Sequence, residues 1–240
     1  ETYDMLSDVG CATRKNVNFS DNGVRLAPTD TFFLNWHPDF ATWKDAMNHR
    51  FVGYTGYGDS DGDGYLTESD FNQLKEILSE GEVLSFANPA WYLLEDEHIT
   101  SIKESNIAGL SNSKYVGQQI SYCSRRKEAY KGDYGYHQLT VVGYDDNIWV
   151  DINADGQVQS DEKGAFQILN SWGETAHNGK PYFWLSYDAF RKDSKVLPAK
   201  SGYVKGRPLS WGKFYNIIYN KTAHNNSAYL KLTLDTAKRT

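Results

Sequence analysis

Two short stretches decide the fold: His137-Gln-Leu-Thr-Val-Val-Gly-Tyr144 and, further along, Asn170-Ser-Trp-Gly173. The first has the apolar and β-branched content of a strand, and the second directly follows the strand-like run at 165–169. No helical pattern separates the two strands, so the residues favour antiparallel pairing over a crossover connection. We expect such pairing to bring the ring of His137, where one strand starts, beside the amide of Asn170, where the next strand ends.

This pair supplies two of the three groups that catalysis by a cysteine thiol requires. The side-chain oxygen of Asn170 can accept a hydrogen bond from one ring nitrogen of His137, which leaves the other nitrogen to face a thiol. A histidine on its own is more often a structural residue of the core. The sequence gives no such partner to the remaining histidines, to which we assign no role: His37, His49, His98, His177 and His224.

The His-x-x-x-x-Val-Gly-Tyr and Asn-Ser-Trp-Gly combination, with Tyr182-Phe-Trp-Leu185 after it, resembles the papain-like cysteine peptidases. The resemblance identifies the chain as the C-terminal portion of a bacterial member. It implies an α+β fold that is mainly the β-rich, antiparallel, barrel-like C-terminal lobe, with the N-terminal helical lobe incomplete or absent. It also implies that His137 is the general base and acid, that Asn170 orients it, and that Trp172 shields their hydrogen bond from water.

Two features depart from the family pattern. Glu174-Thr-Ala-His-Asn-Gly179 stands where a second Trp-Gly pair is usual. No tryptophan follows Cys11, and a predicted helix precedes it, whereas the N-terminus of a helix would stabilise a thiolate. Cys123 lies in a polar loop shortly before His137. We therefore expect the nucleophile upstream of Glu1, or not at all. Our leading expectation is a parent protein that is a cysteine peptidase with an upstream thiol, of which this chain alone is inactive.

The loop Asp59-Ser-Asp-Gly-Asp-Gly-Tyr-Leu-Thr-Glu-Ser-Asp70 has the spacing of an EF-type calcium site. Such a site takes oxygen ligands at positions 1, 3, 5, 7, 9 and 12, and a glycine at position 6. The predicted ligands are Asp59, Asp61, Asp63, the carbonyl of Tyr65, Thr67 and Asp70. The alternative is an acidic turn that caps the amphipathic helix after it.

A second loop, at 151–162, repeats this spacing, but strands rather than helices flank it. Its predicted ligands are Asp151, Asn153, Asp155, the carbonyl of Gln157, Gln159 (through water) and Glu162. A bare hairpin turn rich in Asp, Asn and Gly is the alternative here. We expect one or two structural calcium ions, and no cofactor for catalysis.

The first loop and its exit helix also resemble one half of a dockerin, the calcium-dependent module that docks enzymes onto cellulosome scaffolds. A dockerin needs two such units nearly back to back, whereas the second loop here is distant in sequence and leads into a strand. Our leading expectation is a peptidase that acts on polypeptide substrates. Despite this departure, the rival is a non-catalytic, calcium-binding module on a peptidase-like fold that docks to a cohesin-type scaffold partner. A calcium-stabilised surface adhesin is a third alternative.

Composition excludes other classes of protein. The 240 residues carry a formal net charge of −6 without a Lys/Arg cluster, which argues against nucleic-acid binding. No run of ~18 apolar residues is present, so we expect no membrane span. The use of calcium loops favours a protein that is secreted or held at the cell surface, and the family resemblance implies a bacterial source.

The sequence pattern also predicts the main segments and domains of the chain. We predict short helices at 2–9 and 42–49, and a weakly patterned surface excursion at 95–135. The peptidase-like part is expected to span 1–200, with both calcium-type loops inside it, and 201–240 to be the start of a following β module.

Overall fold

A computed structural model describes residues 2–13, 39–89, 99–122, 125–127, 136–173, 175–192, 203–205 and 214–219. The chain divides into two compact units. Unit 1 comprises 1–20, 25–53 and 218–240, and unit 2 comprises 21–24 and 54–217. Of the helices described, none has the length and apolar character that a membrane span requires.

Unit 1 contains two helices at the predicted places, α1 (Thr2–Asp8) and α3 (Phe40–Asn48). The side chain of Asp39 caps α3 by accepting a hydrogen bond from the backbone N–H of Ala41. Gly10 ends α1 with a φ of +85°, and a Cβ on it would collide with the carbonyl oxygen of Ala46 in α3. Glycine is therefore required at this close approach of the two helices.

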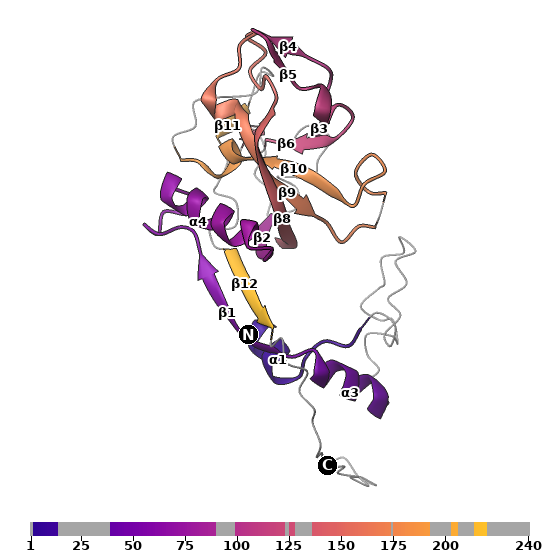
Figure 1. The fold of residues 1–240 in the computed structure, drawn as a ribbon. Helices are drawn as coiled ribbons and strands as arrows, with labels where there is room; N and C mark the ends of the chain where they lie inside the picture. Colours follow the sequence, from indigo (N-terminus) through magenta and orange to yellow (C-terminus); the bar gives the residue numbers. More distant parts are fainter. Residues whose placement is uncertain are drawn as a thin grey trace. The chain divides into compact units, whose positions relative to one another are not determined.

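A mixed sheet has the strand order β1-β12-β2-β8-β9-β10-β6-β3, and all of these strands except parts of β1 and β12 belong to unit 2 (Figure 1). Along the chain these strands are β1 (Phe51–Tyr57), β2 (Leu84–Pro89), β3 (Ile99–Ser101), β6 (Gln119–Ser121), β8 (Tyr136–Trp149), β9 (Lys163–Leu169), β10 (Tyr182–Ser186) and β12 (Phe214–Tyr219). Strands β8 and β9 pair antiparallel, as predicted. Strand β10 pairs antiparallel with β9 and parallel with β6. The described strands form an open order that ends at β1 and β3, so the expected barrel-like closure is not found.

Helix α4 (Glu68–Ser79) packs on this sheet and completes the main core. Its buried side chains Phe71, Leu74 and Leu78 recur at helical spacing, which places them on one face. The sheet contributes most of the other buried apolar residues of the cluster, namely Leu84, Phe86, Leu139, Val141, Phe166, Ile168, Phe183, Leu185 and Phe214. The helix that leaves the first predicted calcium loop is therefore anchored in the core.

The surface excursion predicted for 95–135 is wrong for the residues described there at 99–122. Strand β6 pairs with β10, and β3 pairs with β6, so both extend the sheet. A second buried cluster joins this region to the sheet through Ile102, Tyr115, Ile120, Ile148, Ala165 and Trp184. Strands of three residues are too short to produce the alternation that identifies a strand in a sequence.

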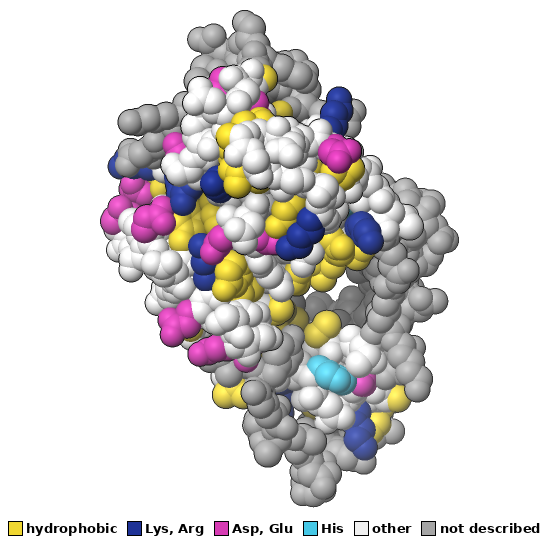
Figure 2. All heavy atoms as spheres, turned by 45° about the horizontal axis from the view of Figure 1, so that its top comes forward, with side chains coloured by type: hydrophobic (Ala, Val, Ile, Leu, Met, Phe, Trp, Pro, Cys, Tyr) yellow, Lys and Arg dark blue, Asp and Glu magenta, His cyan; other side chains and the backbone are white. Residues whose placement is uncertain are grey.

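Two small ribbons complete unit 2, with β4 (Asn106–Ile107) paired to β5 (Leu110–Ser111) and β7 (Arg125–Lys127) paired to β11 (Tyr203–Lys205). The predicted boundary near residue 200 stays a prediction, although β11 and β12 both pair with strands that precede it. On the face shown in Figure 2, acidic and basic side chains of the described residues are interspersed, with apolar side chains between them.

Candidate functional site

The pairing of β8 with β9 creates the site. Thr140 of β8 pairs with Leu169 of β9, so the start of β8 lies beside the residues that follow β9. The Nε2 atom of His137 lies 2.9 Å from Oδ1 of Asn170. The contact expected from the sequence is therefore present, while the catalytic roles of the two residues stay predictions.

Asn170 is held in place at its backbone and its side chain. Its N–H donates to the carbonyl oxygen of Pro181 at 3.0 Å, and the residue is 5% exposed. Its Oδ1 atom also accepts a hydrogen bond from the N–H of Ser171 at 2.8 Å. Oδ1 is therefore fixed as the acceptor that faces His137, and Nε2 of His137 donates to it.

Trp172 stacks on the histidine. Its ring centroid lies 5.5 Å from that of His137, with 29° between the ring planes. Trp172 is itself 51% exposed, so it covers the His137 ring on one side and meets solvent on the other. This geometry suits the predicted shielding of the hydrogen bond between His137 and Asn170.

The sequence analysis missed two residues that belong to this site. Nε2 of His177 lies 3.1 Å from the amide nitrogen of Asn170, and Nδ1 of His177 lies 2.9 Å from Oε1 of Gln119. His177 is 3% exposed, and this burial holds its pKa below the ordinary value of 6.5. The Asn-Gly pair directly after His177 is a hairpin signal that could have indicated a fixed position for this side chain.

Neither cysteine is shown as a partner of His137. Cys11 is a free and exposed thiol in unit 1. Cys123 lies outside the described residues. The expectation of a nucleophile outside this chain stays a prediction.

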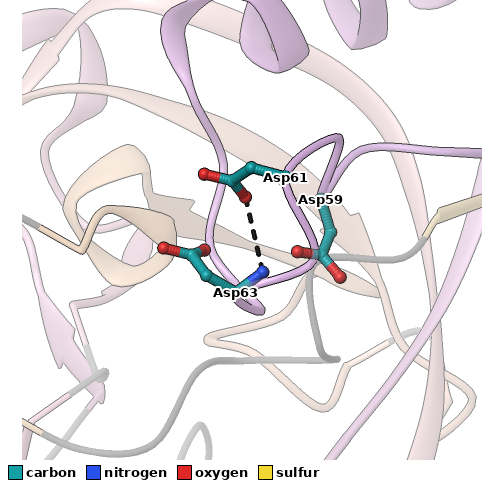
Figure 3. A group of neighbouring side chains, drawn as sticks. All are labelled: Asp59, Asp61 and Asp63. Carbon is teal, nitrogen blue, oxygen red and sulfur yellow. Dashed lines mark hydrogen bonds between the residues drawn. The ribbon is translucent and has the colours of Figure 1, made fainter.

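The first acidic loop brings three carboxylates together. One oxygen each from Asp59, Asp61 and Asp63 lies within 4.8 Å of the others (Figure 3). Asp59 accepts a hydrogen bond from the N–H of Gly64 at 2.7 Å, and Asp63 accepts one from the N–H of Tyr65 at 2.9 Å. Backbone N–H groups thus turn the carboxylates toward one another, an arrangement that a cation would stabilise.

The last two predicted ligands of this loop serve the helix. The N–H and hydroxyl of Thr67 donate to Asp70 at 2.8 and 2.7 Å, and the N–H of Asp70 donates back to the Thr67 oxygen. This capping box starts α4, so Thr67 and Asp70 do what the alternative of a helix-capping turn predicts. A single loop can both cap a helix and bind a cation, because Asp59, Asp61 and Asp63 take no part in the cap.

The first loop also docks on the segment that follows β10. The N–H of Leu66 donates to the carbonyl oxygen of Phe190, at the end of the turn η3 (Tyr187–Phe190), at 2.9 Å. The ammonium of Lys192 lies 2.7 Å from Asp63, and its hydrogen bond holds the pKa of that carboxyl below the usual range. A positive charge therefore already stands against the carboxylate cluster.

The second loop is organised by its own hydrogen bonds. Asp151 accepts from the N–H of Gly156 at 2.9 Å, and Asp155 accepts from the N–H of Gln157 at 2.8 Å. Glu162, in the turn η2 (Ser160–Glu162), is buried and accepts from the N–H of Ile152 at 2.7 Å. Burial raises the pKa of Glu162. Among the described acidic, histidine and cysteine side chains, only the first loop forms a three-membered cluster of potential metal ligands.

The remaining predicted ligands of the second loop stay within the same turn. Asn153 donates from its amide to Asp155 at 3.1 Å, and the N–H of Gln159 donates to Glu162 at 3.0 Å. These contacts are also those of a hairpin turn without metal, so both readings of this loop remain predictions.

Comparisons with known proteins give weak likenesses. No protein family and no curated protein matches the sequence. Among solved structures, the chain is similar to the clostridial cysteine protease Cwp84 after propeptide cleavage, with a TM-score of 0.40 and 17% identity over 85% of this chain and 38% of that chain. It is also similar to SERA5E from Plasmodium falciparum, with a TM-score of 0.35 and 14% identity over 78% of this chain and 49% of that chain. The chain thus spans less than half the length of either structure.

Proposed function

We propose that this chain is the base-bearing part of a papain-like cysteine peptidase, whose thiol is supplied by a segment that precedes it in the parent protein. The observation that carries the proposal is the 2.9 Å contact between Nε2 of His137 and Oδ1 of Asn170. Because this bond uses Nε2, Nδ1 of His137 is the nitrogen that exchanges a proton with substrate and thiol.

The proposed reaction follows from this assignment. Nδ1 of His137 takes the thiol proton, and the thiolate attacks the carbonyl carbon of a peptide bond. His137 then gives the proton to the departing amine, which leaves an acyl-thioenzyme. Water, activated by His137, breaks the thioester and restores the thiol. Asn170 keeps the ring in place throughout, and Trp172 limits the access of water to their hydrogen bond.

We also propose a structural calcium ion in the first loop, held by Asp59, Asp61 and Asp63. Three carboxylates so close together repel one another, and oxygen donors of this kind suit calcium. Bound calcium would stabilise the loop and the start of α4, since a ligand that binds only the folded state adds to its stability. Sites of this kind suit the millimolar calcium of an extracellular location, in line with a secreted or surface protein.

The experiment uses the longer parent protein and a fluorogenic peptide substrate. Replacement His137→Ala should lower kcat/KM by roughly 10²–10⁴-fold, the range for loss of a general base. Asn170→Ala should lower it less, because the base remains. The matched control is His49→Ala, since His49 is an exposed histidine of unit 1 whose ring contacts Asp45.

Equal activity in His137→Ala and in the control would contradict the proposal. In that case the docking module becomes the leading candidate, and calcium-dependent binding to a cohesin-type scaffold is the measurement to make. No contact among the described residues favours docking at present, because the apolar face of α4 is buried in this chain's own core.

A further inference from the structure

Four side chains form one hydrogen-bonded row through the site. It runs from Gln119 in β6 through His177 and Asn170 to His137 in β8, with contacts of 2.9, 3.1 and 2.9 Å. The two central residues, His177 and Asn170, are both buried. The row therefore links the candidate base to a strand on the far side of β9 and β10 in the sheet order.

One arrangement of protons satisfies every bond in the row. Because the N–H of Ser171 donates to Oδ1 of Asn170, the amide NH2 group has to point to His177. Nε2 of His177 is then an acceptor and carries no proton. The proton of the neutral ring is on Nδ1 and donates to Oε1 of Gln119.

We propose that neutral His177 is a positioning residue that holds the Asn170 amide with its oxygen toward His137. By this contact it keeps the proton of neutral His137 on Nε2 and the lone pair on Nδ1. If the amide turned over, its NH2 group would face two donors, Nε2–H of His137 and the N–H of Ser171. The hydrogen-bonded row stands independently of the proposed peptidase function, and only its consequence for catalysis rests on that function.

A tight turn fixes the position of His177. His177 and Lys180 exchange backbone hydrogen bonds of 2.9 and 3.1 Å. Between them Asn178 and Gly179 have positive φ angles of 51° and 79°, as a two-residue hairpin turn requires. The amide of Asn178 in turn donates to the hydroxyl of Ser101 in β3 at 2.6 Å. The ring is thus presented to Asn170 by a turn that is itself tied to the sheet.

The surroundings of His177 favour its neutral form. The described side chains that contact its ring are uncharged: Gln119, Asn170, Trp172 and Phe183. The other titratable group in the row is His137, beyond Asn170. Protonation of His177 would put a hydrogen on its Nε2 atom, which faces the NH2 group of Asn170. Two donors would then oppose each other, so acidification should turn the Asn170 amide over and break its hydrogen bond with His137.

The test is NMR of the 240-residue chain with isotope-labelled histidine nitrogens, which reports the protonated nitrogen of each ring. We expect neutral His177 to carry its proton on Nδ1, the less common tautomer of free histidine, and neutral His137 to carry its proton on Nε2. A neutral His177 with its proton on Nε2 would overturn the proposal, because two donors would then face each other at Asn170.

Two substitutions of similar size distinguish the hydrogen-bond acceptor of His177 from the space that its side chain fills. His177→Leu removes the acceptor, and the Nε2 proton of His137 should then exchange with water about fivefold to tenfold faster, as expected for the loss of one net hydrogen bond. His177→Gln supplies a carbonyl acceptor and should restore slow exchange. Equal exchange in the two variants would contradict the proposal. If His177→Leu does not fold, Gln119→Leu tests the outer end of the row, and it should convert His177 to a mixture of tautomers.

The same variants in the parent protein distinguish the two proposals. A thiol that reacts with a peptidase inhibitor at a rate lowered by His177→Leu and restored by His177→Gln supports both. A parent protein without such a thiol, in which the tautomers are as expected, ends the peptidase proposal and leaves the positioning role intact. Normal inhibitor reactivity together with a Nε2-protonated His177 ends the positioning role alone.

Discussion

Replacement of Gly164 by alanine should destabilise unit 2 more than any ordinary surface substitution. Gly164 lies in β9, where the pairing with β8 is irregular, and its φ is +84°. A Cβ at this position would overlap two ring carbons of Tyr187. Tyr187 is 3% exposed, and its ring centroid lies 5.1 Å from that of Phe71 and 4.8 Å from that of Phe166. The ring therefore has little space into which it can move.

Two terms add in this variant. A left-handed backbone costs a non-glycine residue about 1–2 kcal/mol. Overpacking of a dense core costs about 1–3 kcal/mol. We therefore expect Gly164→Ala to lower the free energy of unfolding by about 2–5 kcal/mol, a large share of a total of about 5–15 kcal/mol. Movement of the ring would also weaken the hydrogen bond from the Tyr187 hydroxyl to Asp146, now 2.9 Å.

Urea unfolding of three alanine variants measures each term. Gly81 has a φ of +86° but open space around it, so Gly81→Ala reports the backbone term alone. Gly143 has an ordinary φ, and a Cβ there would lie 3.6 Å from the side chain of Gln167, so Gly143→Ala should be close to neutral. If Gly164→Ala is no less stable than Gly81→Ala, the packing of Tyr187 against β9 is not as described.

Three further predictions concern the loops and the site. Lys192→Met removes the ammonium beside Asp63, so calcium should bind the first loop several-fold more tightly in a calorimetric titration, and unchanged affinity would place the ion elsewhere. Because burial lowers the pKa of His177, the unfolded chain binds a proton below about pH 6.5 that the folded chain resists; stability should therefore fall on acidification, and His177→Gln should flatten that slope in urea unfolding at several pH values. Gly179→Ala should cost about 1 kcal/mol in the same assay, since its φ is +79° with open space around it.

The contact between His137 and Asn170 was predictable because its causes are local in sequence. Two consecutive strands that are joined without a crossover helix pair antiparallel, so the start of the first strand lies beside the end of the second. The exit helix of the first loop was predictable for the same reason, because Phe71, Leu74 and Leu78 follow the period of a helix.

The contact between His177 and Gln119 was not predictable in this way. Gln119 and His177 are 58 residues apart, and they meet because β6 pairs parallel with β10, where Ile120 lies opposite Trp184. Strand β6 has three residues, too few for a recognisable alternation. The open order of the sheet, in place of the expected barrel, likewise depends on pairings between distant segments.

The central claim is that His137 serves a thiol located elsewhere in the parent protein. Its most direct test is to treat the longer parent protein with an irreversible thiol-directed peptidase inhibitor and to identify the modified residue by mass spectrometry. We predict a single adduct on a cysteine upstream of this chain, formed in the unmodified protein and in His49→Ala but not in His137→Ala. An adduct that forms equally in His137→Ala, or that lies only on Cys11 or Cys123, would contradict the claim.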